Sequence, residues 1–316
     1  MNLDPSTQKF VSDLAASNSP PLYTLTPEQA RDVLLKAQSI PVALPDADVE
    51  ERKLPVGPKG SVRTLLFRPK GSKERLPVVM FIHGAGWVMG DARTHERLVR
   101  ELVKGANVAA VFVDYGRSPE NKFPTAIEEA YAATKYVAEH PEEFNVDARR
   151  MALVGDSVGG NMATVVGMLA KERGGPIIRF QALFYPVTDA SFDSGSYQEF
   201  AEGPWLTRKA MKWFWDAYLP EASKRMDPHV SPLRASLDQL KGLPPALVIT
   251  DENDVLRDEG EAYAAKLSEA GVNVTQVRFL GTHHDFVMLN ALAQTPAARG
   301  AIELTTTRLR EWLHGN

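Results

Sequence analysis

Five short runs of apolar residues recur along the chain, each about as long as one strand of a β-sheet. The runs lie at 78–82, 108–113, 151–154, 182–185 and 246–249. Their apolar residues are continuous and do not alternate with polar ones, which is typical of strands buried on both faces of a sheet. Three more strands are predicted at 49–56, 61–69 and 273–280, the first two joined by the turn Gly57-Pro58-Lys59-Gly60.

Helical spacing of apolar residues fills most of the gaps between these runs. The predicted helices lie at 94–104, 125–139, 161–173, 259–270 and 296–313. Strands that alternate with helices predict an α/β fold with a mostly parallel central sheet flanked by helices. A chain of 316 residues could hold two domains, but α/β folds of this size often form one. We therefore predict a single domain over residues 1–316.

Two segments stand outside this alternation. The first, residues 1–45, contains Thr26-Pro27-Glu28-Gln29, which has the form of a helix-capping box with proline at the first helical position. The second, residues 187–225, is rich in aromatic side chains. One predicted helix face there consists of Met211, Phe214, Trp215 and Tyr218. Both segments must bury apolar surface, either by packing on the main domain or as a helical cap over the carboxyl ends of the strands, where open α/β sheets bind ligands. We expect the cap.

Composition narrows the classes of function. The chain is 44% hydrophobic and 24% charged, as ordinary globular proteins are. Its net charge of −4 and the absence of a Lys/Arg-rich run argue against a nucleic-acid partner. With no cysteine, disulfides, thiolate metal sites and a cysteine nucleophile are excluded. No secretory signal pattern and no long apolar run occur, so we expect no membrane span and a cytoplasmic location.

The first candidate for chemistry is the stretch 155–160, Gly-Asp-Ser-Val-Gly-Gly. It contains a G-x-S-x-G motif between a predicted strand and a predicted helix, the setting of a nucleophile elbow. Such a turn holds its serine on a strained backbone, so that the hydroxyl of Ser157 would project into a cleft. The five-residue pattern alone fits an ordinary glycine-rich turn with a helix-capping serine equally well.

Three further stretches follow predicted strands and favour the nucleophile elbow over an ordinary turn. Residues 83–87, His-Gly-Ala-Gly-Trp, can present backbone N–H groups to an oxyanion. Residues 250–254, Thr-Asp-Glu-Asn-Asp, offer carboxylates, and residues 281–286, Gly-Thr-His-His-Asp-Phe, offer imidazoles. Each stretch alone has a plain explanation as a turn or a solvated loop. Together their order, glycine-rich loop, Ser, Asp, His, is the order of functional parts in α/β-hydrolases.

On these residues the chain resembles the hormone-sensitive-lipase-like branch of the α/β-hydrolases, which includes bacterial carboxylesterases. The likeness covers nearly the whole chain. Its further motifs are Asp114-Tyr115 with Ser118-Pro119-Glu120 and Phe123-Pro124, Ser231-Pro232-Leu233, and the stretch 254–260.

The resemblance implies a serine carboxylesterase that acts through an acyl-enzyme. Short- to medium-chain esters are expected, because the aromatic segment and the narrow turn indicate a small, covered acyl pocket. The resemblance makes Ser157 the nucleophile, Asp254 the triad acid and His284 the base. His284 is preferred to His283 because it fits the family pattern G-x-x-H-x-F. No metal or organic cofactor is needed for this chemistry, and the expected partner is a small ester. A homodimer is compatible with the resemblance.

The resemblance also implies an oxyanion hole and a covered pocket. The oxyanion hole is assigned to the turn Gly84, Ala85 and Gly86, together with Val158. The candidates for the substrate pocket are Trp87, Asp156, Trp205 and Phe214.

Several positions depart from the family pattern. Ala85 replaces a glycine, Val158 replaces the usual alanine, and Asp285 replaces the glycine after the histidine; Val255 and Gly116-Arg117 also differ. No catalytic group is lost. Ala85 and Val158 would narrow the site near the oxyanion. Asp285 would raise the pKa of His284 if its carboxylate approached the ring.

Other carboxylates compete with Asp254 for the role of the acid. Asp251 is expected to hydrogen-bond the local backbone, and Asp258 and Glu259 to serve a helix N-terminus. Glu252 is the strongest rival on reach.

Two other classes of function stay open at this stage. An amidase, formamidase or lactonase would use the same residues on the same fold. A non-catalytic protein of this fold would bury a small ligand under the same cap, since fold alone does not decide function.

Overall fold

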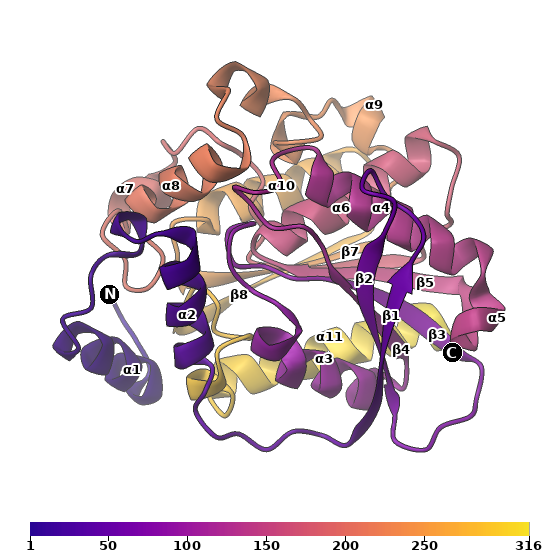
Figure 1. Cartoon of the computed structure of the whole chain (residues 1–316). Helices are drawn as coiled ribbons and strands as arrows, with labels where there is room; N and C mark the ends of the chain where they lie inside the picture. Colours follow the sequence, from indigo (N-terminus) through magenta and orange to yellow (C-terminus); the bar gives the residue numbers. More distant parts are fainter. Residues whose placement is uncertain (316) are drawn as a thin grey trace.

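A computed structural model of the protein, which describes residues 1–315, contains one eight-stranded sheet (Figure 1). The strands are β1 (Ala47–Leu54), β2 (Val62–Pro69), β3 (Leu76–Ile82), β4 (Ala109–Asp114), β5 (Val146–Asp156), β6 (Phe180–Phe184), β7 (Ala246–Asn253) and β8 (Val274–His283). Their order across the sheet is β1-β2-β4-β3-β5-β6-β7-β8. β2 pairs antiparallel with β1 and β4, whereas all pairs from β4 to β8 are parallel. The predicted mostly parallel sheet is therefore confirmed.

Burial along the strands follows their place in the sheet. Every residue of the central strand β3 is buried, while the edge strand β8 alternates between half-buried and exposed positions until its end. Two strands run further than predicted toward the site. β7 continues to Asn253 and β8 to His283, because the two remain paired beyond a register shift near Asp251.

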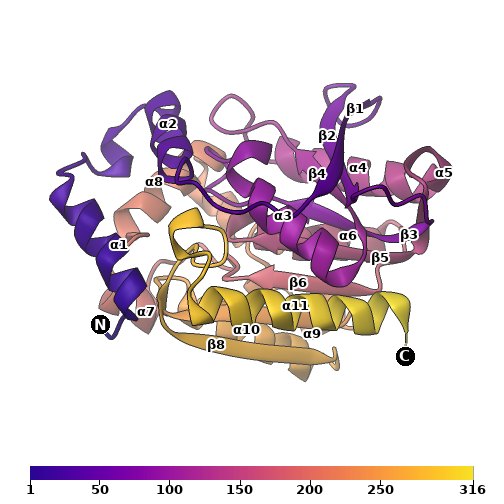
Figure 2. The same ribbon diagram turned by 90° about the horizontal axis from the view of Figure 1, so that it is seen from below.

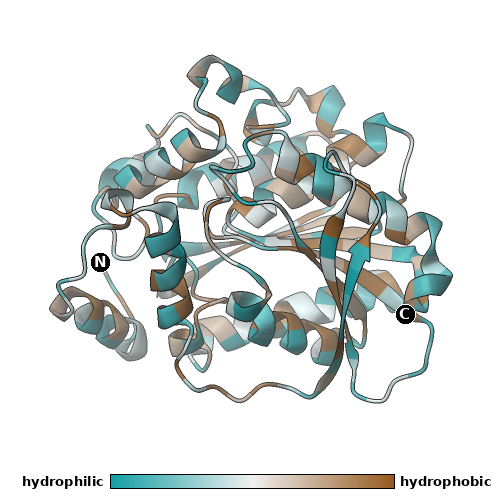
Figure 3. Cartoon of the chain, viewed as in Figure 1, coloured by the Kyte–Doolittle hydropathy of each residue, from teal (hydrophilic) through white to brown (hydrophobic). Residues whose placement is uncertain are grey.

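Helices cover both faces of the sheet (Figures 1 and 2). α3 (Ala92–Ala106) and α11 (Pro296–His314) pack together on one face, and α4 (Thr125–Glu139) and α6 (Val158–Glu172) on the other, with α10 (Arg257–Glu269). Shorter helices are α5 (Pro141–Phe144), α9 (Leu237–Leu240), η2 (Ala222–Met226), η3 (Pro232–Arg234) and η4 (Asn290–Leu292). Along α11, the apolar residues Ala298, Ala301, Ile302, Leu309 and Leu313 are buried, and hydrophilic residues occur between them (Figure 3).

The remaining helices gather at the end of the sheet where the parallel strands terminate (Figures 1 and 2). They are α1 (Pro5–Ala16), η1 (Leu22–Thr24) and α2 (Pro27–Ala37) from the N-terminal segment, and α7 (Gly195–Glu199) and α8 (Arg208–Tyr218) from the aromatic segment. η1 packs against α8, so the two segments meet. We call residues 1–45 and 187–225 the cap. Within residues 1–315, every helix is too short or too polar to cross a membrane.

Local chemistry explains where the cap helices begin. The capping box at Thr26 is formed: its hydroxyl accepts from the N–H of Gln29 at 3.2 Å, and the Gln29 amide oxygen accepts from the N–H of Thr26 at 2.9 Å. The predicted apolar face of α8 is buried. Helix α1 was not singled out by the sequence; Asp4 caps it by accepting from Ser6 and Thr7.

Candidate active site

The elbow at Ser157 joins β5 to α6 directly: β5 ends at Asp156 and α6 begins at Val158. Ser157 lies between them at φ 55° and ψ −121°, a strained conformation for a residue with a Cβ. Its N–H donates to the carbonyl of Phe184 at 2.8 Å. A Cβ on Gly155 would lie 2.2 Å from the carbonyl oxygen of Gly159, and one on Gly159 would lie 2.0 Å from that of Ile82. The backbones are therefore in direct contact, and only glycine fits at these two positions.

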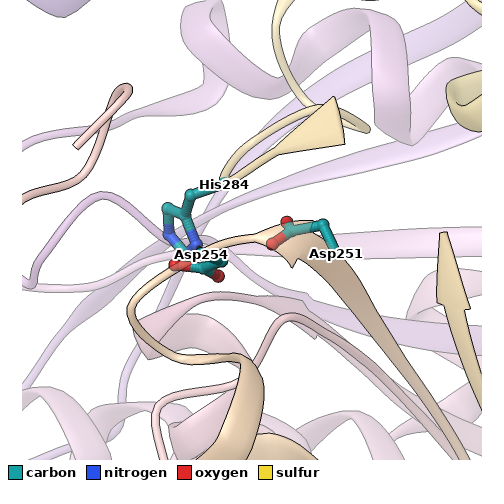
Figure 4. Close-up of side chains that lie close together, drawn as sticks. All are labelled: Asp251, Asp254 and His284. Atoms are coloured by element: carbon teal, nitrogen blue, oxygen red, sulfur yellow. The ribbon is translucent and has the colours of Figure 1, made fainter. Parts of the chain in front are cut away.

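Ser157, His284 and Asp254 form one hydrogen-bonded chain. Oγ of Ser157 lies 2.9 Å from Nε2 of His284, and Nδ1 of His284 lies 2.7 Å from Oδ2 of Asp254. Figure 4 shows His284 and Asp254 pointing toward one another from neighbouring loops. The carboxylate requires the proton on Nδ1, so Nε2 is left to accept from the serine hydroxyl. Oδ1 of Asp254 accepts from the N–H of Leu256 at 3.1 Å.

A second carboxylate approaches the same imidazole. Oδ1 of Asp285 lies 3.5 Å from Nε2 of His284, and Oδ2 accepts from Nε1 of Trp205 at 2.8 Å. Burial works against the imidazolium, but the negative charges of Asp254 and Asp285 outweigh it and raise the pKa of His284 to about 9. Asp285 adopts φ 69°, which explains why glycine is usual at this position.

Two other histidines of the predicted motifs, His283 and His83, have structural roles. The ring of His283 is buried against Phe10, and its Nδ1 lies 2.8 Å from the carbonyl oxygen of His284. Nδ1 of His83 lies 3.0 Å from the carbonyl oxygen of Gly84. Burial lowers the pKa of His283 to about 4 and that of His83 to about 3, so both stay neutral. Neither contacts Ser157.

The glycine-rich turn after β3 supplies backbone donors, with one correction. The N–H of Gly84 donates to Oδ1 of Asp156 at 3.0 Å, so it is not free for an oxyanion. Within residues 1–315, the N–H groups of Ala85, Gly86 and Val158 donate to no other group. Ala85 and Gly86 have φ angles of 74° and 67°, which turn the backbone sharply at this point.

Two predicted pocket residues lie elsewhere. Oδ2 of Asp156 lies 3.1 Å from Nε2 of His95, and both side chains are fully buried. Trp87 is buried behind the turn, where it stacks on Tyr218 with ring centroids 4.1 Å apart and tilts against Trp215 at 4.7 Å. The prediction that Trp87 and Asp156 line the pocket is therefore wrong. The Trp87 side chain packs under the cap, and the Asp156 side chain accepts a hydrogen bond from the N–H of Gly84.

Ser157 and His284 lie at the floor of an apolar cavity of about 190 Å³. Its walls come from both cap segments and from the glycine-rich turn. They include Leu14, Pro21, Tyr23, Leu34, Ala85, Gly86, Trp205, Leu206, Met211, Phe214 and Asp285. Trp205 and Phe214 thus line the cavity where the sequence had placed them. A Cβ on Gly86 would lie 2.1 Å from the ring of Phe214, so the cap rests directly on the turn.

The rival acids are engaged in structural contacts. Glu252 accepts from the N–H of Gly281 at 2.8 Å. Asp258 accepts from the N–H of Ser196 at 2.7 Å, and Glu259 accepts from the N–H of Thr188 at 2.7 Å. Asp258 and Glu259 thereby attach the start of the aromatic segment to α10.

Asp251 differs from its expected role. It is fully buried, and neither of its carboxyl oxygens has a hydrogen-bond partner within residues 1–315. Local backbone hydrogen bonding is thus not what holds it. An oxygen of Asp251, one of Asp254 and a ring nitrogen of His284 lie within 4.8 Å of one another. A metal would have to displace Ser157 or Asp254 from His284, since both ring nitrogens are already engaged.

Comparison with known proteins agrees with this geometry. A family model described as the alpha/beta hydrolase fold matches residues 79–288. The chain belongs to the α/β-hydrolase fold family. A thermostable esterase from Pseudomonas putida has a structure that superposes with a TM-score of 0.97, at 52% identity over 99% of this chain and 98% of that one.

Two sequence relatives support the same branch of the family. Carboxylesterase NlhH of Mycobacterium tuberculosis is 35% identical over 290 residues, 91% of this chain and 90% of the relative. An ethyl acetate hydrolase of Pseudomonas putida is 31% identical over 303 residues, 93% of this chain and 95% of the relative. The predicted place in the hormone-sensitive-lipase-like branch is confirmed.

Sequence reasoning missed His95 and the burial of Asp251. His95 lies inside the first turn of α3, where a histidine gives no signal of a distant carboxylate partner. Asp251 lay in an acidic stretch that looked solvated. It is buried where β7 stays paired with β8 as far as His283.

Proposed function

We propose that the protein hydrolyses short- to medium-chain carboxylic esters through Ser157, His284 and Asp254 and an acyl-enzyme intermediate. Its carboxylesterase relatives assign the bond type, a carboxylic ester. The observation that carries the proposal is the hydrogen-bonded chain from Ser157 through His284 to Asp254, placed on a strained elbow at the floor of an apolar cavity.

The reaction follows from this geometry. Nε2 of His284 takes the Ser157 proton as Oγ attacks the ester carbonyl, and Asp254 holds the imidazole tautomer and stabilises the imidazolium. The N–H groups of Ala85, Gly86 and Val158 stabilise the tetrahedral oxyanion. His284 then gives this proton to the alkoxy oxygen as the C–O bond of the tetrahedral intermediate breaks, and the neutral alcohol leaves. Water repeats the sequence on the acyl-enzyme and releases the acid.

The size of the cavity supports short acyl chains. Both cap segments contribute walls to the cavity that contains Ser157, and Phe214 packs directly against the turn at Gly86. An acyl chain gains affinity only while its methylenes find apolar surface to bury. We expect kcat/KM to peak at acyl chains of about four to eight carbons and then to fall steeply.

The test uses p-nitrophenyl esters of graded acyl length with the wild type and Ser157→Ala. The variant should lose activity by about three or more orders of magnitude, and a fluorophosphonate should label the wild type at Ser157 only. The matched control is Ser19→Ala, because Ser19 lines the same cavity outside the hydrogen-bonded chain. An active Ser157→Ala variant, or labelling at Ser19, would refute the assignment. Parallel amide, formamide and lactone substrates separate the other hydrolase classes.

A further inference from the structure

Asp251 is an acidic side chain that the proposed mechanism does not use. It lies in β7, where its backbone pairs with Phe279 of β8, and its side chain is fully buried. Figure 4 shows its carboxyl group directed toward Asp254 and His284. The three groups lie within 4.8 Å of one another, so Asp251 adjoins the acid of the triad.

The surroundings of Asp251 do not suit an ionised carboxylate. Neither oxygen accepts a hydrogen bond from any donor in residues 1–315, and burying an unpaired charge costs several kcal/mol or forces the group to neutralise. Burial first, and then the negative charge of Asp254, raises the pKa of Asp251 well above its usual range. A protonated carboxyl group, in contrast, carries one O–H donor.

We propose that Asp251 is a neutral carboxylic acid that donates a hydrogen bond to Asp254 and so acts as a positioning residue for His284. This inference rests on the proposed function, because it assigns Asp251 a part in the same hydrogen-bonded chain. Asp254 then receives donors from three sides: the N–H of Leu256, Nδ1 of His284 and the O–H of Asp251.

The extra donor has two consequences. It fixes the orientation of the Asp254 carboxylate, which sets the plane of the imidazole. It also draws negative charge away from the oxygen that faces Nδ1, so His284 is less basic than it would be beside an unsupported carboxylate. Because Asp285 also raises the pKa of His284, a donor on Asp254 keeps more of the imidazole in the neutral form that accepts the serine proton.

The other titratable groups facing this chain come from the neighbouring strand ends. They are Asp254 after β7, His284 and Asp285 at the end of β8, and Tyr185 after β6. His284 is the one group among them that can carry a positive charge, and in that form it is paired with Asp254 at 2.7 Å. Neither oxygen of Asp251 has a cationic partner within hydrogen-bond distance in the part of the chain that the structure describes.

The experiment compares Asp251→Asn with Asp251→Leu in the whole protein. Asparagine is neutral and keeps a donor, whereas leucine has a similar size and no donor. We expect Asp251→Asn to keep kcat within about threefold of the wild type and the acid limb of the kcat/KM profile in place. Asp251→Leu should lower kcat by about tenfold or more with little change in KM. Its acid limb should move to higher pH, because Asp254 loses a donor and His284 becomes more basic.

Three results would overturn the proposal. If Asp251→Leu matches the wild type in kcat and in its pH profile, the donor has no role. If Asp251→Asn moves the acid limb to lower pH, Asp251 was ionised and its charge was raising the pKa of His284. Equal loss in both variants with an unmoved limb would also overturn it, because asparagine keeps the donor that the proposal requires.

A measurement independent of turnover protects the test against misfolding of the leucine variant. The infrared difference spectrum of the wild type minus Asp251→Asn, in neutral buffer, should contain the C=O stretch of a protonated carboxylic acid. Loss of a carboxylate band instead would refute the neutral form. Because Ser157→Ala should keep the same protonated band, failure of the proposed esterase function and failure of this inference remain distinguishable.

Discussion

The site contains two buried pairs of histidine and aspartate that look alike in isolation. In one, Nε2 of His95 lies 3.1 Å from Oδ2 of Asp156. In the other, Nδ1 of His284 lies 2.7 Å from Oδ2 of Asp254. Negative charge raises the pKa of both histidines against the effect of burial. The pairs differ in what the second nitrogen of each imidazole contacts.

In the first pair, the second ring nitrogen and the second carboxylate oxygen are also hydrogen-bonded within the protein. Nδ1 of His95 lies 2.8 Å from Oγ1 of Thr94, and Oδ1 of Asp156 accepts from the N–H of Gly84. This pair links α3 to the glycine-rich turn. In the second pair, Nε2 of His284 faces Ser157 and the cavity. The comparison teaches that contact with Ser157 and with the cavity is what distinguishes the proposed reactive pair from the structural one, since the pairing itself is the same.

Removing the two imidazoles should give the largest contrast. We expect His284→Ala to lower kcat by about four to six orders of magnitude, as loss of a catalytic base does in serine hydrolases. His95→Ala should instead reduce the free energy of unfolding by about 3–5 kcal/mol, because it leaves the charge of Asp156 buried and unpaired. Ester turnover and urea unfolding measure the two effects. The contrast fails if His95→Ala abolishes turnover at unchanged stability.

A neighbouring histidine provides the matched control for the base. His283→Ala should keep most of the activity, since its ring contacts Phe10 and the carbonyl of its neighbour rather than Ser157. A loss equal to that of His284→Ala would leave the identity of the base undecided between the two rings.

Removing the two carboxylate charges should give the next largest difference. Asp254→Asn should lower kcat by about two to four orders of magnitude with little change in KM, because the wrong imidazole tautomer is then favoured. Asp156→Asn should cost about tenfold or less in kcat, since its amide oxygen can still accept from Gly84. Steady-state kinetics with one short-chain ester compares them. Normal turnover by Asp254→Asn would refute its role as the acid.

A smaller effect is expected at the turn that the structural pair holds. Gly86→Ala places a methyl group against the ring of Phe214 and should shift the oxyanion donors, with a loss of about 10- to 100-fold in kcat. Gly60→Ala is the control, because Gly60 has φ 74° with no atom within 4 Å of the added Cβ. Both variants carry the same backbone strain. Equal activity in the two would show that the contact with Phe214 is unimportant.

These contrasts also mark what the sequence could predict. The sequence was enough to predict the order of strands and helices. It was also enough to predict Ser157, Asp254 and His284, because the motifs that contain them follow strands whose ends meet at one edge of a parallel sheet. The structural pair could not be predicted in this way, because His95 lies inside helix α3 and belongs to no motif that indicates a contact with Asp156. Gly84 and Trp87 were misplaced for a related reason. A motif names the residues of a turn, but only packing decides which N–H is already bound and which ring lies beneath the cap.

The smallest expected effect is a displacement of the activity profile along the pH axis. It concerns Asp285, whose Oδ1 lies 3.5 Å from Nε2 of His284. His284 must be neutral to accept the serine proton, so kcat/KM should rise as pH increases through its pKa of about 9. Asp285→Asn removes one of the two negative charges that raise this pKa, so the acid limb should move to lower pH by about one unit. The amide oxygen can still accept from Trp205, which preserves the local geometry. Glu252→Gln is the control, since Glu252 is bound to the N–H of Gly281 and should leave the limb in place. An unmoved limb in Asp285→Asn would mean that Asp285 is neutral in the free enzyme, as its burial favours, and that Asp254 alone sets the basicity of His284.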